Sequence, residues 1–138
     1  MFGPTNAQIK WAVQQGLEAT LEKLFDPLPQ PAPPVNSYVD EDPNVPIGST
    51  WINAPYSGVP LGDAIGYRSR SLHSWIIGQM WQEGISIREK LKMFWHNHFP
   101  LADVVDPKFH YRYLALFSTY AWGNFRELTL DVSIDPAI

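Results

Sequence analysis

The chain has 138 residues, a formal net charge of -4 and no cysteine. This length suits one domain and is short for two, and the hydrophobic content of 45% is enough to build a core. The basic residues are scattered, so nucleic acid is an unfavourable partner, because phosphate binding needs clustered lysine and arginine. The lack of cysteine excludes disulfides, thiolate nucleophiles and cysteine-ligated zinc.

Export and membrane signals are missing from the sequence. No apolar stretch approaches the roughly 20 residues that a membrane-spanning helix needs. The opening Met-Phe-Gly-Pro-Thr has neither the basic start nor the apolar run of a signal peptide. If the natural protein is exported, we expect its export signal to lie outside this chain.

The N-terminal region carries strong helix signals. Thr5 followed by Gln8 is a capping-box pattern, which predicts a helix start. Gly16 is expected to end or kink this helix, because glycine favours helix ends. A second short helix is predicted from Leu17 to about residue 25, and Pro27 stops it.

Residues 27–46 contain seven prolines, so regular helix is excluded there. The composition predicts extended or irregular chain that acts as a stiff spacer or a surface insertion. The alternative is that Pro31 and Pro34, which have PxxP spacing, bind a partner domain with an aromatic groove. Trp51 and Tyr56 follow in the same loop, where we expect them to pin the loop to the core. Alternatively, they could stack on a sugar ring.

The second half of the chain reads as consecutive helices. The first is predicted from about Asp63 to Gly84, with an apolar stripe at helical spacing. Ser86, with Glu89 three residues later, predicts a capped start for the next helix, which Pro100 ends. The sequence Asp106-Pro107 starts another helix, and a last helix follows from Asn124 to about residue 134. In the helix predicted from about Asp63 to Gly84, the side chains that form the stripe are Leu72, Trp75, Ile76, Gln79 and Met80.

These signals predict an all-α fold of five or six helices in an irregular bundle. Helices are expected at about residues 5–25 and 63–134, separated by a proline-rich loop over residues 27–62. We expect residues 1–138 to form a single helical domain, or the N-terminal part of a larger helical domain.

The richest cluster of functional side chains is Trp-His-Asn-His-Phe, residues 95–99. On an α-helix, His96 and His98 are about 200° apart, so they should diverge and not share one metal ion unless the turn unwinds. The helical phase predicts that His98 faces the core and that His96 lies on the more polar side. Structural roles are the plainer interpretation of both histidines.

A binding or metal role remains the alternative. The candidate binding residues are Trp95, His96, Asn97, His98 and His110. The candidate metal ligands are His96 and His98, and the candidate cofactor is a divalent transition metal. Glu127 and Asp131, one helical turn apart, could hold a hard cation, although a capping residue and a solvated carboxylate are the simpler interpretation.

Three stretches carry a resemblance to a known family. They are residues 2–5 (Phe-Gly-Pro-Thr) leading into 16–18 (Gly-Leu-Glu), residues 88–99, and residues 123–128 (Gly-Asn-Phe-Arg-Glu-Leu) followed by 135–137 (Asp-Pro-Ala). Together they resemble the bacterial family called domain of unknown function 1800. The resemblance implies an exported protein, periplasmic or extracellular, whose biochemical function is not established. It also implies that this chain is the N-terminal part of a longer protein.

Two functions from different classes fit these observations. The first is a structural or interaction segment that packs against its own C-terminal region or a protein partner, and that self-associates when made alone. The second is half of an enzyme site, in which residues 95–99 serve a metal-assisted hydrolase or oxidoreductase. Whether the protein is an enzyme stays open at this level.

Overall fold

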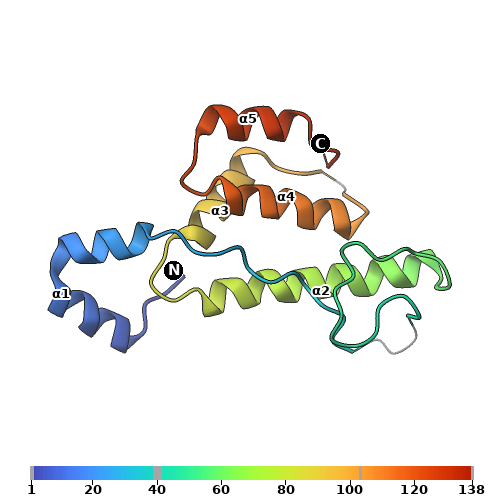
Figure 1. Cartoon of the computed structure of the whole chain (residues 1–138), viewed down its shortest axis with the longest axis horizontal. Coiled ribbons are helices and arrows are strands. Elements are labelled where there is room, and N and C mark those ends of the chain that lie inside the picture. Colours follow the sequence, from blue (N-terminus) through green and yellow to red (C-terminus); the bar gives the residue numbers. More distant parts are fainter. Residues whose placement is uncertain (1, 39–41, 103, 138) are drawn as a thin grey trace.

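The protein is all-α, as predicted, in a computed structural model that describes residues 2–38, 42–102 and 104–137 (Figure 1). The helices in these ranges are α1 (Asn6–Phe25), α2 (Leu61–Gln82), α3 (Arg88–His98), α4 (Pro107–Thr119) and α5 (Phe125–Ser133). No helix within the described ranges is long and apolar enough to cross a membrane.

Helix α4 is the centre of the bundle, because it contacts α2, α3 and α5. In Figure 1, α2 and α5 lie on opposite sides of it. Its start matches the prediction: Asp106 accepts a hydrogen bond from the backbone N–H of Lys108, and Pro107 occupies the first turn. Tyr113 and Phe117 are fully buried and pack edge to face, with 4.7 Å between ring centroids.

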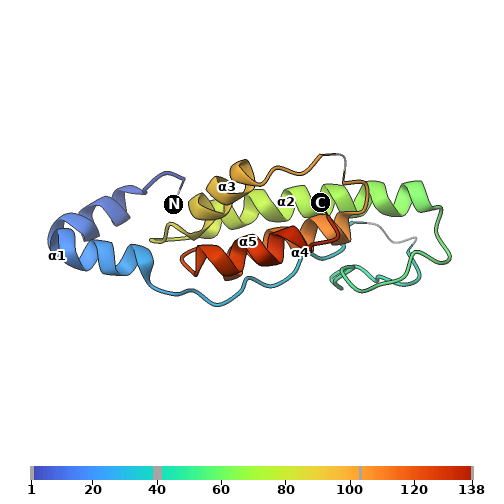
Figure 2. The same ribbon diagram turned by 90° about the horizontal axis from the view of Figure 1, so that it is seen from above.

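Helix α1 stands apart at one end of the molecule (Figure 2). The capping box of Thr5 and Gln8 is present, as predicted. Gly16 kinks the helix with a φ of +82°, a left-handed conformation that glycine adopts without strain. None of the residues of α1 is buried. Near its end, the Leu24 carbonyl accepts a hydrogen bond of 3.2 Å from the Ile87 N–H.

The first half of the proline-rich segment has no regular helix, as predicted, and it is anchored to α2. Its carbonyls accept hydrogen bonds from side chains of α2: Trp75 Nε1 donates to Ala32 at 2.7 Å, and Ser71 Oγ donates to Val35 at 2.7 Å. Pro34 is buried. Because prolines lack an N–H, this segment has few backbone donors, and side chains of α2 satisfy the carbonyls of Ala32 and Val35.

Trp51 and Tyr56 pin the loop to the core, as predicted. Trp51 is fully buried, and its Nε1 donates to Ser71 Oγ at 3.0 Å. The alternative of sugar stacking is wrong for Trp51, because no face of its ring is exposed. The Tyr56 ring packs 4.4 Å from the Arg68 guanidinium carbon.

A fully buried arginine, Arg68 of α2, organises this loop. Its Nη2 donates hydrogen bonds of 3.0 Å to the Asp42 carboxylate and to the Pro55 carbonyl. Its Nη1 donates to the Ala54 carbonyl at 3.2 Å. Neither Arg68 nor Asp42 has an exposed side chain. Burial opposes the ionisation of Asp42, but hydrogen bonds from Tyr67 and Arg68 outweigh it and hold the pKa of Asp42 below its ordinary value.

Replacing Arg68 should therefore destabilise the folded protein. Arg68→Met leaves the Asp42 carboxylate buried without its cation, which should lower the free energy of unfolding by about 3–5 kcal/mol. Urea denaturation followed by circular dichroism measures it. Arg70→Met, two residues along α2 at an exposed position, is the matched control and should cost less than about 1 kcal/mol. Equal losses in the two variants would contradict this role of Arg68.

Candidate functional site

Helix α3 turns its charged side toward the protein. Arg88, Glu89 and Lys92 are buried, whereas Phe94 and His98 are exposed. The prediction that His98 faces the core is therefore wrong, whereas His96 lies on the more polar side, together with Lys92, as predicted. The prediction for His98 assumed that the apolar side of α3 must face inward, but the charges on the other side are ion-paired and can be buried together.

The buried charges of α3 form one connected group. The Glu89 carboxylate lies 2.8 Å from Lys92 Nζ and 3.3 Å from Arg88 Nε. Arg88 also donates to the Pro29 carbonyl at 2.7 Å, which ties the proline-rich segment to α3. Lys92 Nζ lies 5.2 Å from the centroid of the Trp75 ring, within the range of a cation–π contact.

The predicted capping box at the start of α3 is wrong. Ile87 occupies the N-cap position and makes no side-chain cap. Ser86 Oγ accepts from the Arg88 N–H at 3.1 Å, one residue earlier than predicted. The Glu89 carboxylate does not reach back to the cap because it pairs with Arg88 and Lys92, and its N–H donates to Glu83 Oε1 at 2.7 Å.

His96 and His98 diverge, as the helical geometry predicts. The His96 ring stacks beside His110 of α4, with 6.1 Å between centroids. The His98 ring packs 4.6 Å from Phe94 on another face of α3. His110 also faces His73 of α2, at 6.5 Å. In the described part of the chain, no group of three or more histidine or acidic side chains is placed to hold a metal ion.

A pocket of about 240 Å³ opens between α2, α3 and α4, and we call it the His96 pocket. Each helix lines it with residues that share one face, at spacings of three or four. Its walls are mostly apolar, with a few polar groups, as in small-molecule sites. The lining residues are Ile76, Met80, Glu89, Lys92, Met93, His96, Asn97, His110 and Leu114.

The pKa values of three residues that line the His96 pocket, His96, His110 and Lys92, are lowered. Burial lowers the pKa of His96, and burial together with the neighbouring His96 and His73 lowers the pKa of His110. Burial also lowers the pKa of Lys92, although the Glu89 carboxylate opposes this effect. Two neutral imidazoles, each with one donor and one acceptor nitrogen, therefore face the same pocket as an ammonium group.

The pocket brings together some of the predicted site residues and leaves others out. His96, Asn97 and His110 line it. His98 lies on another face, and Trp95 stacks on Phe125 with 5.4 Å between ring centroids. Among the described residues, Trp95 Nε1 is buried without a hydrogen-bond partner.

Sequence reasoning missed the other residues of α3 that line the pocket. Glu89, Lys92 and Met93 precede His96 and Asn97 at helical spacing, so all five lie on one face of α3. Taking this face of α3 as the buried one would have identified them, but the charges of Glu89 and Lys92 indicated a solvent-exposed face.

The predicted pair of carboxylates on α5 does not stand free. Asp131 Oδ2 accepts a hydrogen bond of 2.6 Å from the Tyr120 hydroxyl. Glu127 lies in the first turn of α5 and is exposed. Asp131 thus ties α5 to the end of α4, so the interpretation of a solvated carboxylate is wrong for it.

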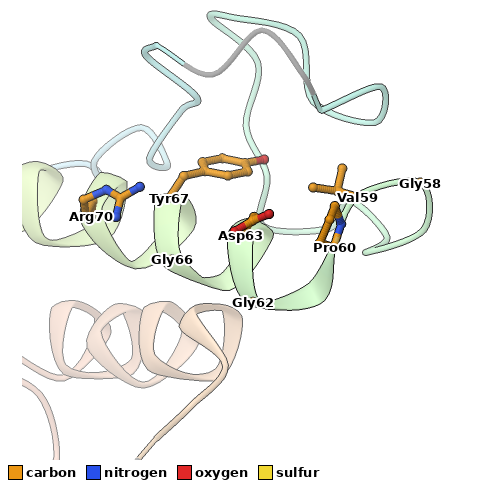
Figure 3. Close-up of a pocket in the computed structure, with 8 residues that line it drawn as sticks. All are labelled: Gly58, Val59, Pro60, Gly62, Asp63, Gly66, Tyr67 and Arg70. Carbon is orange, nitrogen blue, oxygen red and sulfur yellow. The ribbon is translucent and has the colours of Figure 1, made fainter.

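A larger cavity of about 440 Å³ lies at the other end of α2, away from residues 95–99 (Figure 3). Asp63, Tyr67 and Arg70 project into it from one side of α2, and Val59 faces them from the preceding loop. Two of its polar side chains bind other residues: the Tyr67 hydroxyl donates to Asp42, and Arg70 Nε donates to the Tyr38 hydroxyl at 2.7 Å. The His96 pocket is therefore the better candidate site.

Comparison with known proteins agrees with the resemblance seen in the sequence. The family described as "Protein of unknown function (DUF1800)" matches residues 1–138. The chain belongs to this family. Neither a curated protein nor a solved structure matches it. Membership of DUF1800 assigns no reaction, so function has to be argued from the geometry.

The depressed pKa values of His96 and His110 predict that the fold loses stability in acid. Both histidines bind protons more weakly in the folded chain than in the unfolded chain. The free energy of unfolding should therefore fall as the pH drops from about 7 through the ordinary histidine pKa of about 6.5. Urea denaturation at several pH values measures this slope.

Variants identify which imidazoles carry the effect. His96→Gln and His110→Gln should each reduce the slope between pH 7 and pH 5 by about half. His98→Gln, at an exposed position on the same helix, should leave it unchanged. The same slope in all three variants would contradict the assignment.

Proposed function

We propose that this chain is an interaction module whose helix α1 docks on an apolar protein surface. The main support is that α1 buries none of its residues, although its sequence is amphipathic. Isolated surface leucines need no explanation, but a stripe of exposed apolar side chains is typical of a protein contact. The stripe has two parts, one on each side of the Gly16 kink. Its residues are Ile9 and Val13, then Leu17, Leu21 and Phe25, each at least 45% exposed.

A second exposed patch supports the same proposal. Trp81 is 89% exposed and Ile77 is 64% exposed, both on the last turns of α2. The C-terminal end of α2 lies at the end of the molecule nearest to α1 (Figure 1). Tryptophan is enriched where one protein packs on another. The partner we propose is the C-terminal region of a longer polypeptide or a separate protein.

We also propose that the protein is exported to the periplasm or the extracellular space. This proposal rests on the resemblance to exported bacterial proteins. Fractionation of the native host would contradict it by finding the protein in the cytoplasm.

Without a partner, the exposed stripe should drive self-association. Light scattering coupled to size exclusion should show a mean mass that rises with concentration above 15.7 kDa. Val13→Glu combined with Leu17→Glu should shift the chain toward the monomer, because charge on the stripe opposes apolar contact.

The control adds the same charge beside the stripe. Gln14→Glu with Gln15→Glu, at exposed positions on α1, should leave association unchanged. A monodisperse monomer at high concentration would contradict the proposal. So would an equal effect of the two double variants.

A second candidate function is one half of a metal-assisted hydrolase or oxidoreductase site. The observation in its favour is the pairing of His96 with His110 at the mouth of an apolar pocket. Two imidazoles leave coordination positions that a facing surface would have to complete. Metal analysis of the longest natural form should then find a transition metal, lost in His96→Ala and in His110→Ala. Retention in both variants would exclude this site.

A further inference from the structure

We propose that the His96 pocket binds a small carboxylate that carries an apolar tail. This inference does not depend on α1, which contributes no residue to the pocket.

The apolar walls set the size and character of the tail. Ile76 and Met80 of α2, Met93 of α3 and Leu114 of α4 supply these walls. The volume of about 240 Å³ equals that of about eight water molecules in the liquid. A ligand of about eight non-hydrogen atoms would therefore fill it, with its tail against these four side chains.

Lys92 supplies the positive charge that a carboxylate needs. Its side chain is only 6% exposed, and Lys92 is one of the residues that line the pocket. An ammonium group has three donors. In the described part of the chain, Lys92 Nζ uses one on Glu89 Oε2 and faces the Trp75 ring. A ligand oxygen would meet an ammonium that little water can reach, and such charge-assisted hydrogen bonds are the strong ones.

The remaining polar groups favour an acceptor over a cation. His96, His110 and Asn97 line the pocket, and each side chain carries at least one N–H donor. Its one carboxylate among the lining residues, that of Glu89, already pairs with Lys92 and Arg88. A cationic ligand would therefore be repelled by Lys92 and would find no unpaired carboxylate among the lining residues. Charge thus selects a carboxylate over an amine of the same shape.

The histidine rings provide a direct test of binding. We would titrate the 138-residue chain with hexanoate, hexan-1-ol and hexylamine, at a protein concentration where light scattering finds a monomer. Two-dimensional NMR of the labelled histidine rings follows each titration. Hexanoate should cause saturable shifts at His96 and His110 and none at His98, which lies on another face of α3.

Comparison of the three ligands tests the role of charge. Hexan-1-ol should bind at least about tenfold more weakly than hexanoate, since it lacks the charge that Lys92 would pair with. Hexylamine should cause no saturable shift. Binding of hexylamine as tight as that of hexanoate would overturn the proposal, and so would hexanoate shifts that never saturate.

Variants separate the pocket from unspecific contact. Lys92→Met should weaken hexanoate binding by about tenfold or more, whereas Lys90→Met, an exposed lysine on the same helix, should not. Met93→Trp narrows the pocket at a half-exposed position that tolerates a larger side chain, so it should also weaken binding and keeps the test decisive if Lys92→Met fails to fold. Unchanged affinity in Met93→Trp would overturn the proposal.

Discussion

The buried ion pair between Arg68 and Asp42 is the interaction on which the loop half of the molecule depends. A buried guanidinium group needs a counter-ion and hydrogen-bond acceptors. Asp42 supplies the negative charge, and the carbonyls of residues 54 and 55 accept further hydrogen bonds from Arg68. The network adds to the few backbone hydrogen bonds of the loop, such as those of the bridge between Val35 and Thr50. It joins residues 42, 54 and 55 to one side chain of α2.

Helix α3 also has a buried ion-paired group in which an arginine binds a loop carbonyl. There Arg88 donates to the Pro29 carbonyl, and the Glu89 carboxylate pairs with both Arg88 and Lys92. Because these charges are ion-paired, the helix can bury its polar face and leave Phe94 exposed. The buried polar face of α3 lines the His96 pocket. A face of close-packed apolar side chains at this position would leave less space. Arg88, which binds the proline-rich segment, and Glu89 and Lys92, which line the pocket, are thus all buried on α3.

Local signals were sufficient for most of the helices. Thr5, Gly16, Asp106 and Asn124 act through the backbone of their own turn, so their sequence neighbourhood predicts the helix boundary. The orientation of α3 could not be predicted in this way. It depends on a carbonyl at Pro29, 59 residues earlier in the chain, and on contact with α2 and α4. For the candidate site, the residue types His96, Asn97 and His110 were found, while Lys92 and Glu89 were passed over because isolated charges are normally solvated.

The positive φ of Gly16 has a consequence for how α1 behaves. It divides the helix into two arms of fewer than a dozen residues each, and helices of that length are marginal in water without tertiary support. Since neither arm buries a side chain, little holds their amide protons away from solvent. Deuterium should enter α1 long before it enters α4, and a bound partner would reveal its footprint by slowing that exchange.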